Sequence, residues 1–297
     1  ATLDISGNAD IDGTLNTDGL TNAGNFSTDG GTIKLDGNYP TGTCNVALGD
    51  NALGSGSLSG DFNTAVGTNA LLANTSADAN TAIGRSSLCS NTTGDCNTGL
   101  GMNALLGNTE GFGNVAVGRS SMVANTTGDD NVAVGQNSLV SNTTANNNTA
   151  VGTCSLASNT TGASNVALGH DALKLNTTGA QNTAVGMDAL RDTTTGCRNT
   201  AMGYNSLVLN TTGICNVSIG RSTLDANTTG DFNTAVGNSA LSGNTTADNN
   251  TAVGHLSLNA NTTGAGNVAV GANAGDAITT GPNNTALGFE AASKLTT

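Results

Sequence analysis

The sequence predicts an all-β protein, a parallel β-solenoid or β-roll of about fifteen coils that follows a short β neck. Three observations support this prediction. A 17-residue unit recurs in fifteen copies, Gly accounts for 42 of the 297 residues, and Trp is absent. We expect two domains, a neck over residues 1–40 with a six-residue repeat and a rod over residues 41–297.

The unit reads N-[TV]-A-[VLIM]-G-x-x-[AS]-L-x-x-N-T-T-G-x-x, and its first Asn is called position 1 here. The first copy begins at Asn45 and the second at Asn63, 18 residues later, and every further step to Asn284 is 17 residues. Helix-pair repeats need about 30 residues or more, and Gly, Asn, Thr and Val disfavour helix. Each unit is therefore expected to form one coil of two short strands, and the coils to stack by parallel pairing.

Positions 2 to 4 predict a strand whose two faces differ. Position 2 is Thr or Val and position 4 is aliphatic or Met, so we expect both to join the Leu of position 9 in the core. Position 3 is Ala in thirteen copies, with Gly99 and Ser218 as the exceptions. A side chain that is always small implies close approach by another backbone. Three apolar side chains per coil make a thin core for a lone solenoid, so we expect an oligomer that packs against the small position 3 face.

Positions 1 and 5 predict ladders of equivalent residues along the rod. Stacked Asn side chains form amide ladders in cross-β arrays, and position 5 is Gly in every copy, which indicates a positive φ or no room for Cβ. The ladder residues expected in the early coils are Asn63, Asn80, Asn97, Gly67, Gly84 and Gly101.

The N-terminal segment follows a shorter repeat. Between residues 3 and 38, a set of five Gly follows steps of six or twelve residues, which indicates short strands joined by tight turns: Gly7, Gly13, Gly19, Gly31 and Gly37. The chain begins with Ala1 in place of an initiator Met, which predicts a processed or partial product.

Composition argues against several classes of protein. Eight basic and twenty-one acidic residues give 8 − 21 = −13, and so few basic residues cannot form the stripe that nucleic acid requires. No run of about 18 apolar residues occurs, so we expect no membrane insertion.

Catalytic, metal and cofactor sites are not predicted. His170 and His255 occupy the same repeat position five coils apart, about 24 Å by coil spacing, and cannot share a metal within one chain. The six Cys contain no CxxC pair. Cys197 and Cys215 lie 18 residues apart and could approach each other, although free thiols are the favoured interpretation. We expect no enzymatic activity.

Position 6 is the most variable position of the unit. Coil stacking should align its side chains into one exposed stripe, which is either an unconstrained corner or a contact surface for a host glycan or protein. The candidate receptor-facing residues are Arg85, Arg119, Gln136, His170, Tyr204, Arg221, His255 and Phe289.

The motif N-[TV]-A-[VLI]-G-x-x-A over residues 45–292 resembles the head repeat of trimeric autotransporter adhesins of the YadA type. The longer form NTAVGxxALxxNTTGxxNTAVG, together with the opening LDISGNADIDGTLNTDGLT, is similar to tail-fibre proteins of marine and cyanobacterial bacteriophages. This resemblance implies an intertwined or side-by-side homotrimer on the virion or another extracellular surface. Its partners would be other tail proteins and a glycan or protein of the bacterial host.

Three functions therefore stay open. The leading one is a structural tail-fibre segment that mediates or supports attachment to the host. The second is the head of a bacterial trimeric adhesin. The third is an ice-binding solenoid, because the Thr pairs at positions 13 and 14 would stack into a two-column array.

Overall fold

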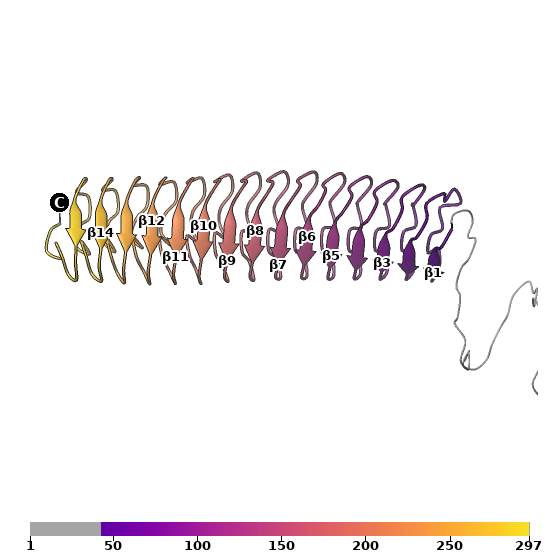
Figure 1. Cartoon of the computed structure of the whole chain (residues 1–297), viewed down its shortest axis with the longest axis horizontal. Coiled ribbons are helices and arrows are strands. Elements are labelled where there is room, and N and C mark those ends of the chain that lie inside the picture. Colours follow the sequence, from indigo (N-terminus) through magenta and orange to yellow (C-terminus); the bar gives the residue numbers. More distant parts are fainter. Residues whose placement is uncertain (1–42, 297) are drawn as a thin grey trace, which may run out of the picture. The chain divides into compact units, whose positions relative to one another are not determined.

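The computed structural model describes residues 43–296, which form an all-β parallel solenoid of about fifteen coils without helices. One strand from each coil joins a single fifteen-stranded sheet whose strand order is the sequence order. The coils stack in a row, and the strands run across the long axis of the rod (Figure 1). The neck expected over residues 1–40 lies outside the described residues.

Each strand covers positions 2 to 4 of its unit. Neighbouring strands pair in register, so that each residue lies beside its equivalent in the next coil, as Val115 does beside Val132. The strands are β1 (Val46–Leu48), β2 (Thr64–Val66), β3 (Thr81–Ile83), β4 (Thr98–Leu100), β5 (Val115–Val117), β6 (Val132–Val134), β7 (Thr149–Val151), β8 (Val166–Leu168), β9 (Thr183–Val185), β10 (Thr200–Met202), β11 (Val217–Ile219), β12 (Thr234–Val236), β13 (Thr251–Val253), β14 (Val268–Val270) and β15 (Thr285–Leu287).

The prediction of two strands per coil was wrong, because the structure has one. Positions 7, 9 and 17 adopt a left-handed backbone, as in Asn137 with φ 56°, Leu139 with φ 48° and Asn147 with φ 61°. A residue in this conformation cannot continue a strand. The rest of each unit is therefore a series of turns held by hydrogen bonds to the adjacent coils.

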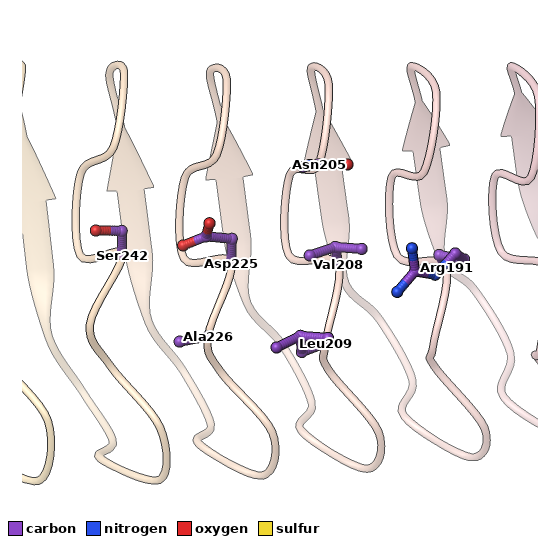
Figure 2. A pocket seen from close by; sticks show the side chains of 7 residues that line it. All are labelled: Arg191, Asn205, Val208, Leu209, Asp225, Ala226 and Ser242. Atoms are coloured by element: carbon purple, nitrogen blue, oxygen red, sulfur yellow. The ribbon is translucent and has the colours of Figure 1, made fainter.

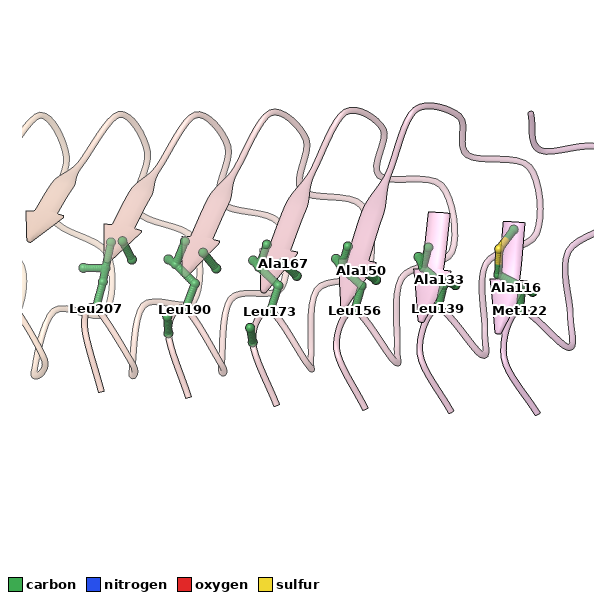
Figure 3. Close-up of a cluster of buried hydrophobic side chains, with 14 of the residues drawn as sticks. Ala116, Met122, Ala133, Leu139, Ala150, Leu156, Ala167, Leu173, Leu190 and Leu207 are labelled. Atoms are coloured by element: carbon green, nitrogen blue, oxygen red, sulfur yellow. The ribbon is translucent and has the colours of Figure 1, made fainter. Parts of the chain in front are cut away.

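The assignment of the two strand faces was also wrong. Position 3 points into the coil, where Ala133 and Leu139 are fully buried, while positions 2 and 4 lie outside and are half-buried or exposed. Figure 3 shows the Ala of each strand beside the Leu or Met of position 9. Position 3 is therefore small because the core of its own coil is narrow. Its size is no evidence for a neighbouring chain.

The Asn of position 1 forms a buried ladder through the rod. In Asn97 the backbone N–H donates to Oδ1 of Asn80 at 2.8 Å, and in Asn80 it donates to Oδ1 of Asn63 at 2.9 Å. The amide nitrogen is used as well, since Nδ2 of Asn114 donates to the carbonyl of Gly128 at 2.8 Å. These amides supply the partners that buried polar groups need.

The Gly of position 5 stacks backbone on backbone. Gly67 and Gly84 both have φ +129° and Gly101 has φ +135°, a region that side chains rarely adopt. A Cβ on Gly67 would lie 2.8 Å from the carbonyl carbon of Gly84 in the next coil. Position 5 thus has two independent reasons to be Gly.

A second Asn ladder runs along position 12. Nδ2 of Asn108 donates to the carbonyl of Gly111 at 2.9 Å, closing the turn, and to Oδ1 of Asn91 at 2.8 Å. Thr193 interrupts this ladder. Oγ1 of Thr193 and Oδ1 of Asn176 are both buried without a hydrogen-bond partner among the described residues.

Replacing Gly135 by Ala should lower the free energy of unfolding by about 1–3 kcal/mol from backbone strain alone. Its φ is +135°, and an added Cβ would meet the carbonyl oxygen of Gly152 at 2.5 Å. Urea denaturation measures the loss. The matched control is Gln136→Ala, at an exposed neighbour, which should change stability by less than about 0.5 kcal/mol. Equal effects from both variants would contradict the stacking argument.

Replacing Thr193 by Asn should stabilise the rod by about 1–3 kcal/mol, the usual cost of a buried unsatisfied group. The new amide is placed to donate to Oδ1 of Asn176 and so to complete the ladder. The midpoint of urea unfolding should rise. Asn159→Thr, which creates the same interruption in an intact part of the ladder, should lower that midpoint. An unchanged midpoint in both variants would show that the ladder contributes little.

Candidate functional site

Column 6, the set of residues at position 6 of successive coils, follows the ends of the strands. All eight candidate residues named above are exposed. Successive coils are joined there by backbone bonds such as Asn137 N–H to the Arg119 carbonyl at 3.1 Å. The candidates therefore lie in one line along an edge of the sheet.

Few contacts hold the column 6 side chains in place. Nη2 of Arg85 lies 3.3 Å from Sδ of Met102, and Nδ1 of His170 lies 3.7 Å from a carboxylate oxygen of Asp171. The four ion pairs found among the described residues involve neither Arg119 nor Arg221. These guanidinium groups are available to a partner outside the chain.

Column 16 lies before the starts of the strands and so borders the opposite edge of the sheet. Where it carries Asp, one carboxylate oxygen accepts a backbone N–H from the preceding coil: Asp95 from Asp78 at 2.8 Å, and Asp231 from Ile214 at 2.8 Å. The second oxygen of each carboxylate is left for a further partner.

The outer face of the sheet, formed by positions 2 and 4 of β1–β15, carries no charged residue. Position 2 is Thr or Val, and position 4 presents side chains such as Leu100, 43% exposed, and Leu168, 48% exposed. Sequence reasoning missed this surface because it placed both positions in the core. The nine Thr at position 2 were the available signal, since Thr is more typical of an outer face than of an apolar core.

The two Thr columns do not form one outward array. At position 13 the hydroxyl donates to the carbonyl of the equivalent Thr one coil on, as Thr126 does to Thr143 at 3.0 Å, and the side chain is half-buried. At position 14 the Thr is exposed, as in Thr127 and Thr144. A single column of Thr therefore faces outward.

An open hollow of about 400 Å³ lies over positions 10 and 11 of four neighbouring coils. Figure 2 shows Val208, Leu209 and Ala226 along it, with Arg191 toward one end and Ser242 toward the other, and Asp225 in the same coil as Ala226. Arg191 already binds Asp192, with Nε 2.8 Å from Oδ1. Burial raises the pKa of the Asp225 carboxyl above its ordinary value. Besides Arg191, the polar side chains that line the hollow are Asn205, Asp225 and Ser242.

The cysteines and histidines are dispersed. All six Cys are free thiols, including Cys197 and Cys215, which are joined only through a backbone hydrogen bond of 3.1 Å. Residues 43–296 contain no group of His, Cys, Asp and Glu arranged to hold a metal ion. In the same part of the chain, no helix is long and apolar enough to cross a bilayer.

Comparison with protein-family models, curated proteins and solved structures gives no match. The functional argument therefore rests on the surfaces of the rod itself.

Proposed function

We propose that this chain is a segment of a homotrimeric fibre, most simply a virion tail fibre, that supports attachment to a bacterial host. The observation that carries the proposal is the uncharged outer sheet face of β1–β15. The likeness of the repeat to tail-fibre and YadA-type repeats points the same way.

The size of this face fits a stable interface. Fifteen strands at about 4.8 Å spacing extend over about 70 Å, and three residues span about 10 Å. The footprint is therefore roughly 700 Å², close to the roughly 800 Å² that each partner buries in a standard protein interface. The position 4 side chains form a continuous apolar column along this face, and a large exposed apolar patch is typical of an interaction site.

The repeat indicates what covers the face. Apolar side chains recur once per coil, so the best match is a surface with the same spacing. A second and a third copy of the chain, aligned parallel to the first, present a surface with this same spacing. In a ring with closed rotational symmetry, the outer sheet face of every copy is then covered by the other copies.

The geometry of a trimeric rod favours attachment, because it presents several equivalent contact surfaces at once. It holds three equivalent surfaces along one axis, so weak contacts to a host glycan or protein add up through effective concentration. Three chains carry 3 × −13 = −39 formal charges, which keeps fibres apart in solution. Other virion proteins would anchor its ends.

Two other functions have specific support. The head of a bacterial trimeric adhesin would use the same assembly on a cell surface. Ice binding is favoured by the outward Thr column at position 14. A thermal-hysteresis assay on the purified chain separates ice binding from both attachment functions.

The native mass should be close to three times 28.9 kDa in analytical ultracentrifugation. Val117→Lys with Val134→Lys places two charges on the sheet face and should reduce the mass toward 28.9 kDa, because Lys is costly to bury. The control is Thr127→Lys with Thr144→Lys, in the exposed column 14, which should leave the trimer intact. A monomeric wild type would overturn the proposed assembly.

Antibodies raised against the rod should label filaments that project from virus particles in immunogold electron microscopy. Labelling of a bacterial cell surface without virions would favour the adhesin alternative. Labelling confined to the interior of cells would contradict both attachment functions, because neither could reach a host surface.

A further inference from the structure

We propose that the hollow over positions 10 and 11 is a binding site for a neutral sugar ring, a pyranose of a glycan on the host surface. That the sugar belongs to a host glycan rests on the proposed attachment function. The binding of a sugar ring itself depends only on side chains of the four coils that line the hollow, between Arg191 and Ser242.

The hollow lies on the wall of the coil that faces away from the sheet. Leu207, at position 9, is fully buried and points into the coil toward the strand wall (Figure 3). Val208 and Leu209 follow it in the chain, and the strands lie behind them in Figure 2. A trimer that covers the outer sheet face therefore leaves this hollow open, and three copies present three equivalent hollows for multivalent contact.

The floor of the hollow is apolar. Val208 is 8% exposed and lies between Arg191 and Asp225, which occupy position 10 of the two adjacent coils. Leu209 beside it is 41% exposed, and Ala226 continues the apolar surface into the next coil. An apolar surface with a few polar groups around it is typical of a small-molecule site, and it matches the C–H face of a sugar ring.

Polar groups that can both donate and accept hydrogen bonds surround this floor. The amide of Asn205 offers two donors and an acceptor, and the carboxyl of Asp225 offers acceptors. The hydroxyl of Ser242 donates to Oδ1 of Asn259, which leaves its own lone pairs for an incoming donor. Sugar hydroxyls also donate and accept, so they match this set.

The charges of the hollow favour an uncharged ligand. Arg191 already binds Asp192, with Nε 2.8 Å and Nη2 3.0 Å from its two carboxylate oxygens, and Asp188 lies 3.8 Å from Nη1. An anion would therefore approach two carboxylates together with the guanidinium. A cation would gain only Asp225, and burial raises the pKa of that carboxyl, which disfavours its charged form.

The wall behind the hollow is held by buried hydroxyl groups. Ser218 is the only Ser at position 3, and Thr223 is the only Thr at position 8. Oγ of Ser206 lies 2.7 Å from Oγ of Ser218, which donates to the carbonyl of Thr223 at 2.8 Å. Oγ1 of Thr223 donates in turn to the carbonyl of Gly237 at 2.6 Å. These bonds join three of the lining coils, and such support holds binding groups in place.

Saturation-transfer NMR on the wild-type protein tests the site with four neutral probes, the methyl glycosides of glucose, galactose, mannose and N-acetylglucosamine. We expect at least one of them to bind, and to bind more tightly than the charged probes glucuronic acid and glucosamine. A titration of the best neutral probe then gives its dissociation constant.

Two substitutions should weaken that binding about five- to tenfold, because each removes one polar or apolar contact. Leu209→Ser removes an apolar side chain of the floor, and Asn205→Asp removes the amide donors. Both variants should keep the fold, since other coils already carry Ser158 at position 11 and Asp188 at position 7.

The matched controls make the same changes outside the hollow. Leu175→Ser alters a side chain at position 11 that has the same 41% exposure as Leu209. Asn137→Asp alters position 7 of a coil that does not line the hollow. Both controls should bind the best neutral probe as tightly as the wild type does.

Three results would overturn the site: no transfer from any of the four neutral glycosides, tighter binding of a charged probe, or equal weakening by Leu175→Ser and Leu209→Ser. Analytical ultracentrifugation of the same samples separates the two proposals. A native trimer that binds no neutral sugar overturns the site and leaves the fibre standing. A monomer that binds sugar, and loses it on Leu209→Ser alone, supports the site and overturns the trimeric fibre.

Discussion

The rod depends on how closely each coil stacks on the next. At position 5 the backbones of successive coils lie so near that a Cβ would meet the adjacent carbonyl, and at position 1 each Asn hydrogen-bonds the backbone of the following Asn. Both contacts require equivalent residues at equal chain spacing. Insertions are therefore tolerated only where the stack begins, as in the 18-residue step from Asn45 to Asn63.

The close stack also explains the composition. Besides its buried Asn side chains, a typical coil encloses only an Ala, a Leu and a small residue at position 8, so no aromatic side chain fits inside. Where position 8 is Ser, its hydroxyl donates to a backbone carbonyl: Ser121 to Ala133 in the strand of the next coil at 3.0 Å, and Ser155 to Gly152 of its own coil at 2.9 Å. Buried amides and hydroxyls take the place of a large apolar core, which is why Asn, Thr and Gly dominate the sequence.

Periodicity predicted the coils, the strand at positions 2 to 4 and the stacked Asn and Gly, because these follow directly from equal spacing. It could not decide which strand face was inside. Ala at position 3 was interpreted as a contact with another chain, whereas the fully buried Leu139 of the same coil is what limits its size. The left-handed backbone of Leu139, φ 48°, was also beyond prediction, since Leu rarely adopts it and only tertiary packing enforces it. At the candidate site, exposure of column 6 was foreseen, while the outer sheet face was missed.

A stack of nearly identical coils creates a problem of its own. Two such rods pack almost equally well after a slip of one coil, because the outer sheet face repeats with the same small set of apolar side chains. In the proposed fibre, information about register would therefore reside where coils differ, as they do at positions 6 and 16, which border that face.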